Sequence, residues 1–152
     1  MKLSTKGRYG LRAMVDIAVY SQDSPVPIRA IAERQNISVR YLEQLLPKLK
    51  KAGIIKSIRG AQGGYMLDKD PKDISAGDIL RTLEGDLTPI DCAAFTGDTS
   101  TCSGTKFCVT KTVWQRINDS VQQAVDSITL QELMEESIEI HTKYDQEERQ
   151  ES

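Results

Sequence analysis

Residues 54–67 are the most distinctive part of the chain, because they predict a β-hairpin in a sequence that otherwise favours helices. The first strand covers Ile54–Arg59 and the returning strand covers Tyr65–Leu67. The run Gly-Ala-Gln-Gly-Gly at residues 60–64 lies between them and supplies the glycines that a tight turn needs. The sequence therefore predicts a basic hairpin with a glycine-rich tip.

Two helices are predicted at the start of the chain. Ser4 is a suitable N-cap for the first, which begins near Thr5. A loop over residues 22–27 ends this helix, and a short second helix runs from Ile28 to Gln35. The apolar positions at helical spacing, which we expect to face the core, are Leu11, Met14, Val15, Ala18 and Val19 in the first helix and Ile28, Ile31 and Ala32 in the second.

A third helix begins at Val39 after a tight turn, with Ser38 as its N-cap. Its apolar seam consists of Leu42, Leu45, Leu46 and Leu49. Pro47 lies within this pattern, so we expect a kink or a break into two helical pieces there. Two short helices followed by a basic hairpin are the elements of a winged helix-turn-helix, in which a helix enters the DNA groove and the wing lies alongside.

Charge is distributed unevenly along the chain. Residues 1–67 contain 12 Lys and Arg against 4 Asp and Glu, a net charge of +8, whereas the remainder carries −10. A partner meets this local field rather than the overall charge of −2. A basic half is expected of a protein that binds the phosphate backbone, and a solvated basic face is the alternative explanation.

The second half of the chain predicts helices on either side of a loop. Ser75 begins a fourth helix, which Gly85 ends. A long amphipathic helix is expected from about Thr110 to Ser127, and a capping box at residues 129–132 begins a final helix. The last residues are charged and almost without apolar side chains, so we expect them to be disordered.

The long helix needs a partner for its apolar stripe, which consists of Val113, Trp114, Ile117, Val121, Ala124, Val125 and Ile128. The stripe can pack within its own chain, but we favour a two-fold dimer. A palindromic DNA site read by two helices about 34 Å apart needs a two-fold protein. The predicted fold is mainly α with a small β-hairpin: a winged helix-turn-helix domain at 1–85, a cysteine-containing loop at 86–109, a dimerisation helix and a final helix at 110–137, and a disordered acidic tail at 138–152.

The chain contains three cysteines, Cys92, Cys102 and Cys108, in a polar, glycine-punctuated loop. No signal-peptide core or membrane-spanning run is present, so we expect a cytoplasmic protein without a membrane partner. Thiols stay reduced in that compartment, which favours metal-binding, redox-sensing or catalytic cysteines over disulfides. Because no histidine lies near the thiols to act as a base, we do not expect an enzyme or a small-molecule substrate.

Several motifs, in order, give the chain a resemblance to a known family. They are Leu-Ser-Thr-Lys-Gly-Arg-Tyr-Gly at 3–10, Ser-Val-Arg-Tyr-Leu-Glu-Gln-Leu at 38–45, Arg-Gly-Ala-Gln-Gly-Gly-Tyr at 59–65 and Ile-Thr-Leu-Gln-Glu-Leu at 128–133. Up to about residue 134 the chain resembles the bacterial iron–sulfur cluster regulators of the IscR type, which are winged-helix transcription factors. The resemblance implies a homodimer that represses or activates genes, commonly those for cluster assembly, according to whether a 2Fe–2S cluster is bound.

The resemblance also implies which residues read double-stranded DNA: Ser38, Arg40, Tyr41, Glu43 and Gln44 in the third helix and Arg59 in the wing. Gln44 can pair with adenine, Arg40 can bind guanine or phosphate, and Arg59 suits a narrow minor groove.

Two of these positions have an alternative role. The carboxylate of Glu43 can accept only from an exposed amino group such as that of cytosine, so it can select against sites. Its alternative is a salt bridge to Lys50 or Arg40. Tyr41 can equally be a packing residue with its hydroxyl at the surface.

The cysteine loop departs from the family pattern. The family places five residues between its first two cysteines, whereas Cys92 and Cys102 enclose nine; the five between Cys102 and Cys108 match. Lys111 stands where the family has a histidine ligand, and a protonated ammonium has no lone pair to offer. The hypothesis is a 2Fe–2S cluster held by the three cysteines, with zinc as the alternative metal. The fourth ligand is open among Lys111, Asp91, Asp98, a residue of the other subunit and an added small thiol, and His141, the only histidine, is expected to be an ordinary surface residue.

Three functions are compatible with these residues. We expect a dimeric DNA-binding regulator controlled by a cluster. The alternative within the same fold is a thiol-redox or cysteine-metabolism regulator without a stable cluster. A winged helix that binds protein instead of DNA is a third, and strongly salt-dependent binding to duplex DNA would exclude it.

Overall fold

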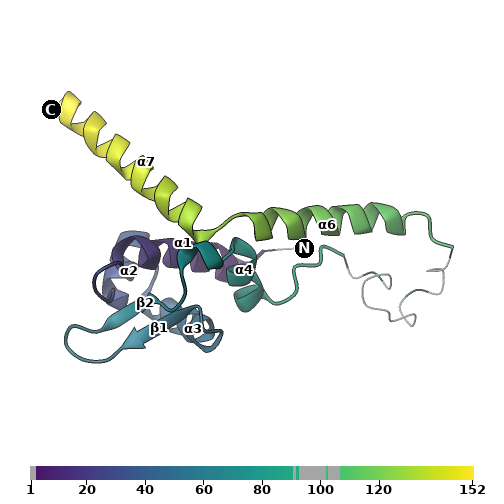
Figure 1. The fold of residues 1–152 in the computed structure, drawn as a ribbon, viewed down its shortest axis with the longest axis horizontal. Coiled ribbons are helices and arrows are strands. Elements are labelled where there is room, and N and C mark those ends of the chain that lie inside the picture. The colour runs from purple at the N-terminus through teal and green to yellow at the C-terminus, as the bar shows by residue number, and fades with distance from the viewer. Residues whose placement is uncertain (1–2, 91, 93–101, 103–106) are drawn as a thin grey trace.

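The computed structural model describes residues 3–90, 92, 102 and 107–152, whose arrangement Figure 1 shows. The elements in chain order are α1 (Thr5–Tyr20), α2 (Ile28–Gln35), α3 (Val39–Lys51), β1 (Ile55–Ile58), β2 (Gly64–Leu67), the 3-10 turn η1 (Pro71–Asp73), α4 (Ala76–Glu84), α6 (Lys111–Ser127) and α7 (Leu130–Glu151). The helices α1–α4 and the hairpin form one body, from which α6 and α7 extend in different directions. No helix in the described part of the chain is long and apolar enough to cross a membrane.

Helix α1 lies at the centre of the body and packs against α2, α3, α4, α7 and β2. The prediction of its inward face is only partly right. Met14 and Ala18 are buried as expected, but Ala13 and Ile17 are buried as well, whereas Leu11, Val15 and Val19 are partly exposed. A helix that is covered on several sides has no single apolar stripe, and so a one-sided pattern misplaces its buried face.

Of the kink or break expected at Pro47, the break into two helical pieces does not occur, because α3 is one continuous helix. Pro47 itself is exposed, while Leu45, Leu46 and Leu49 on either side of it are buried in the core. An interior proline costs a helix about 3 kcal/mol, and burying each leucine contributes about 1.5–3 kcal/mol. Packing of the leucine seam therefore outweighs the cost of the proline.

The hairpin pairs β1 and β2 antiparallel, with Ile55 opposite Leu67. Strand β2 is also joined to the segment before α2, because Tyr65 and Val26 exchange two backbone hydrogen bonds of 2.8 and 2.9 Å. A Cβ atom at Gly64 would overlap the Val26 carbonyl, so this close approach requires glycine. The predicted hairpin is therefore present and is anchored to the helical body.

Helix α7 covers almost all of residues 138–152, so the disorder expected there is wrong. The predicted capping box is present: Thr129 Oγ1 accepts from the Glu132 amide at 3.2 Å, and the Glu132 carboxylate accepts from the Thr129 amide at 2.9 Å. Farther along, Lys143 pairs with Glu139 at 2.8 Å, one helical turn away. Capping and pairs of this kind support a helix even where apolar residues are few.

Helix α6 lies against α4 and buries none of its residues within the described chain. Val113 is 49% exposed and Ile117 is 41% exposed. Ile117, Val121 and Ala124 line a shallow apolar groove on this helix. The apolar stripe expected on the long helix is thus present, and its own chain covers it only in part.

Candidate nucleic-acid interface and cysteine segment

The start of α3 presents three of the predicted DNA-reading side chains to solvent. Ser38 caps the helix, and its Oγ accepts from the backbone amide three residues later at 3.1 Å. Because the leucine seam faces the core, Arg40, Glu43 and Gln44 are exposed. The structure describes every residue of this helix, and Glu43 forms no ion pair with Arg40 or Lys50. Within the described part of the chain, Glu43 is therefore an exposed carboxylate without an ion-pair partner, on the face that would meet DNA.

Tyr41 packs against the first turns of α1. Its hydroxyl lies 2.9 Å from Thr5 Oγ1, and its ring meets the Tyr9 ring edge-on with the centroids 5.8 Å apart. The guanidinium carbons of Arg8 and Arg12 lie 6.0 and 5.4 Å from the centroid of Tyr9. Tyr41 thus joins the start of α3 to a basic part of α1, which matches the packing alternative considered for this residue.

Arg59 is exposed in the turn of the hairpin, directly after β1. The Gly63 amide closes this turn by donating to the Gly60 carbonyl at 3.0 Å. Gly60 has a φ of 115°, which side chains other than hydrogen rarely allow. Since β1 packs against α3, the hairpin that carries Arg59 adjoins α3. Figure 1 shows the hairpin and α3 side by side.

The three cysteines lie between α4 and α6 in the chain. Cys92 and Cys108 are half-buried, and Cys102 is exposed. Among the residues that the structure describes, no three metal-binding side chains lie together. Asp91 and Asp98, two candidates for a fourth ligand, lie outside those residues.

Cys108 lies at the approach to α6. Its Sγ is 3.1 Å from Thr110 Oγ1, and this hydrogen bond lowers the pKa of the Cys108 thiol, assisted by the backbone amide and the charge of Lys111. A thiolate is the form of cysteine that binds metal and attacks oxidants. His141 lies on α7, where its Nδ1 is 2.7 Å from the Ser137 carbonyl oxygen.

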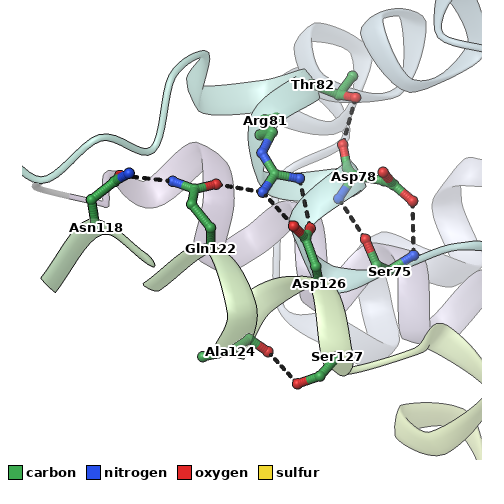
Figure 2. A network of polar contacts seen from close by, with 9 residues as sticks. All are labelled: Ser75, Asp78, Arg81, Thr82, Asn118, Gln122, Ala124, Asp126 and Ser127. Atoms are coloured by element: carbon green, nitrogen blue, oxygen red, sulfur yellow. Dashed lines mark hydrogen bonds and ion pairs between the residues drawn. The ribbon is translucent and has the colours of Figure 1, made fainter. Parts of the chain in front are cut away.

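An ion pair that the sequence did not indicate joins α4 to α6. Arg81 contacts the two carboxylate oxygens of Asp126 at 2.7 and 3.0 Å and donates to Gln122 Oε1 at 2.5 Å (Figure 2). The hydrogen bonds raise the pKa of Arg81 and lower the pKa of Asp126. These residues are far apart in the sequence, and each one alone looks like an ordinary surface residue, so no local pattern could have identified them.

Comparison with known proteins gives consistent relatives. The profile of Rrf2, described as an iron-dependent transcriptional regulator, matches residues 3–136. The HTH-type transcriptional regulator IscR of Vibrio vulnificus is 43% identical over 147 residues, which are 95% of this chain and 85% of that protein. The structure of IscR from T. potens is 45% identical with a TM-score of 0.71, over 90% of this chain and 88% of that one. CymR, the global cysteine regulator of B. subtilis, is 41% identical with a TM-score of 0.74, over 89% of this chain and 97% of that one.

These relatives confirm the resemblance to IscR and the predicted fold, a mainly α winged helix-turn-helix with a hairpin and a long C-terminal helix. They are named as transcriptional regulators, which confirms that the chain is not an enzyme. Its general function is DNA-binding transcriptional regulation. The chain therefore belongs to the Rrf2 family of transcriptional regulators.

Proposed function

We propose that the chain is a cytoplasmic homodimer that binds a palindromic operator and is controlled by a 2Fe–2S cluster at Cys92, Cys102 and Cys108, with cluster-assembly genes among its targets. The observation that carries this proposal is the position of the chain's only cysteines, in the segment that links the DNA-binding body to α6. A group bound there acts on both parts of the chain at once.

The DNA-binding role falls to the exposed side of α3 and to the wing. Gln44 is free to pair with adenine, and Arg40 is free to bind guanine or phosphate, because both are exposed beside the capped start of α3. Arg59 in the wing suits the minor groove. The exposed carboxylate of Glu43 repels phosphate and so favours operators that offer it a cytosine amino group.

The proposed dimer interface is the uncovered stripe of α6. Its members include Val113 and Ile117, which are 49% and 41% exposed in the single chain. Packing against the same stripe of a second copy would bury them, and a two-fold arrangement would present two recognition helices to a palindrome.

Three thiols fit the chemistry of a 2Fe–2S cluster, because iron–sulfur clusters take thiolate ligands. The described residues do not identify the fourth ligand of the cluster. Lys111 lies in the first turn of α6 beside Cys108, so it is near the place where the family supplies a histidine, but its ammonium carries no lone pair while protonated. Asp91, Asp98, a residue of the partner subunit and a small thiol are the other candidates. A cluster with a weak fourth ligand is easily lost, which would suit a sensor of iron–sulfur supply.

The experiment is anaerobic purification followed by iron and sulfide analysis. We expect about two irons and two sulfides per chain. Affinity is then measured for duplexes enriched from a random library, with loaded protein and with a variant in which the three cysteines are replaced by alanine. Colourless, iron-free protein that stays colourless after reconstitution would exclude the cluster. Equal affinity of the loaded and cysteine-free proteins for every duplex would exclude its control of DNA binding.

The likeness to CymR favours a second candidate function. The chain resembles CymR about as closely as it resembles IscR, both in TM-score and in sequence identity. In this alternative the cysteines serve a thiol-redox or cysteine-metabolism regulator without a stable cluster. Titration of the free thiols with and without oxidant, alongside DNA binding, separates the two. DNA affinity that follows thiol oxidation in iron-free protein supports the alternative.

A further inference from the structure

Glu84, the last residue of α4, holds the first turn of α1. Its Oε1 accepts from the Ser4 amide at 2.9 Å, from Ser4 Oγ at 2.6 Å and from the Gly7 amide at 2.8 Å. The first amides of a helix have no partner within the helix, and a carboxylate at this end also meets the positive end of the helix dipole. The first turn of α1 has no acidic residue of its own, so α4 supplies this carboxylate from 77 to 80 residues away in the chain.

The contact depends on a close approach of the two helices. A Cβ atom at Gly7 would lie 2.9 Å from Glu84 Oε1 and 3.0 Å from Leu80 Cδ2. A Cβ atom at Gly10, one turn later, would overlap the side chain of Leu83. Because these glycines leave no side chain between the helices, a shift of the end of α4 moves the start of α1 directly.

The start of α1 in turn contacts the start of the recognition helix. Thr5 Oγ1 lies 2.9 Å from the hydroxyl of Tyr41, and Tyr9 packs edge-on against the Tyr41 ring. The Tyr41 amide donates to Ser38 Oγ, the cap of α3. The contacts therefore run from Glu84 through the first two turns of α1 to the first turn of α3.

The same helix α4 is connected to the other half of the chain. Arg81, one turn before Glu84, pairs with Asp126 and Gln122 of α6 (Figure 2). Gly85 follows Glu84 directly and begins the stretch that leads to Cys92. Helix α4 thus lies where the cysteine segment, α6 and the recognition helix can influence one another.

We propose that Glu84 is a positioning residue that holds recognition helix α3 in its DNA-reading orientation through α1, and that it transmits changes in the cysteine segment to α3. The second part rests on the proposed function, since it requires that the cysteine segment changes state. Neutralising the carboxylate keeps an acceptor oxygen, but it weakens the charge-assisted hydrogen bonds from Ser4 and Gly7 and removes the negative charge at the positive end of the α1 dipole. This loosens the first turn of α1 and weakens its hold on Tyr41. Glu84 does this without contacting DNA.

The direction in which DNA affinity changes when Glu84 is replaced distinguishes a positioning role from an effect of its charge on DNA. Glu84 is negative, so if it acted on DNA only through its charge, removing it would tighten binding to every duplex. If it positions α3, removing it weakens binding to the selected sequence and leaves non-specific binding unchanged or slightly tighter.

The test compares Glu84→Gln with Glu148→Gln in the full chain. Glu148 is exposed near the end of α7, so the second variant makes the same change in charge away from the α1–α4 contact. Fluorescence anisotropy at fixed salt measures binding to a duplex enriched by wild-type protein from a random library and to an unselected duplex of equal length. We expect Glu84→Gln to weaken binding to the enriched duplex about tenfold, which corresponds to about 1.4 kcal/mol. Glu148→Gln is expected to behave as wild type.

Wild-type affinity of Glu84→Gln for the enriched duplex would overturn the positioning role, as would an equal loss on both duplexes. A milder variant, Thr5→Val, removes only the link to Tyr41 and tests the route in a double-mutant cycle. The effect of Glu84→Gln should be smaller in the Thr5→Val background, because the two changes interrupt one path. Strictly additive effects would overturn that path.

Transmission is tested by the ratio of affinities of cluster-loaded and cysteine-free proteins. If the wild type shows a ratio different from one, Glu84→Gln should bring it toward one, and an unchanged ratio overturns transmission. A ratio of one in the wild type instead overturns cluster control and transmission together. The effect of Glu84→Gln in the cysteine-free protein still decides the positioning role in that case, so the two proposals fail separately.

Discussion

Asp16 of α1 and Arg34 of α2 form an ion pair whose two partners differ in burial, so we expect their replacement to have unequal effects on stability. Arg34 donates to both carboxylate oxygens of Asp16 at 2.8 Å, and Gln35 adds a third hydrogen bond at 3.1 Å. The Asp16 side chain is fully buried, whereas the Arg34 side chain is 33% exposed and lies over the ring of Tyr20 at 3.8 Å. Removing the arginine leaves a buried charge, but removing the carboxylate leaves an arginine that water can reach.

We expect Arg34→Met to lower the free energy of unfolding by about 3 kcal/mol. This is the lower end of the 3–5 kcal/mol cost of breaking a buried pair, because Gln35 still donates to the carboxylate. Asp16→Asn should cost less, about 1–2 kcal/mol, in the lower part of the range of about 1–3 kcal/mol for an unsatisfied buried group, because the arginine left behind can reach water. The first loss is a large fraction of the 5–15 kcal/mol that stabilises a typical domain.

Urea unfolding followed by circular dichroism measures both variants, at one fixed protein concentration because association shifts apparent stability. Arg29→Met is the matched control, since Arg29 is exposed on the same helix and its loss changes the charge equally. It should cost less than about 0.5 kcal/mol. The reasoning is refuted if Arg34→Met costs no more than this control or if Asp16→Asn costs more than Arg34→Met.

Three further predictions follow from other contacts. Ile117→Asp should convert the proposed dimer to monomers in sedimentation experiments and weaken operator binding at least tenfold, and a dimer that persists in this variant would place the interface elsewhere. Thr129→Ala removes the cap of α7 and should lower the free energy of unfolding by about 1 kcal/mol, measured by urea unfolding; no change would contradict the role of the capping box. Hydrogen bonds from Ser4 lower the pKa of Glu84, so its stabilisation is full above the pKa of the unfolded carboxyl and is lost as the pH falls through the lowered pKa. Glu84→Gln should therefore flatten the acid side of the stability profile, and an unchanged slope there would contradict this assignment.

The likeness to both IscR and CymR makes the cysteine segment the decisive part of this chain. Both structures match about nine-tenths of the chain, so the shared fold fits the proposed cluster-controlled regulator and the alternative cysteine regulator equally well. The distinction depends on the chemistry at Cys92, Cys102 and Cys108. Lys111 and the widened first spacing are the features of this sequence that bear on it.

Local sequence patterns were sufficient for the order of the elements and for the outward residues of α3. Ser38 caps a helix whose leucine seam must face the core, so Arg40, Glu43 and Gln44 have to point outward. The hairpin follows from its strands and the glycines between them for the same reason: each depends on residues a few positions apart. At Pro47 the helix continues without a break, and residues 138–152 are helical where a disordered tail was expected. In both places local propensity was outweighed, in one case by burial of the leucines and in the other by capping and charge pairs along α7.

Contacts between residues that are far apart in the sequence could not be predicted from local sequence patterns. Glu84 meets Ser4, Arg81 meets Asp126 and Asp16 meets Arg34 only after the helices have packed, and each side chain is unremarkable in its own segment. Periodicity records which side of a helix is apolar, but it carries no information about which polar residue lies across the interface. The helix-turn-helix and its wing are therefore properties of local sequence, whereas the contacts that join α4 to α1, α1 to α3 and α4 to α6 exist only in the packed chain.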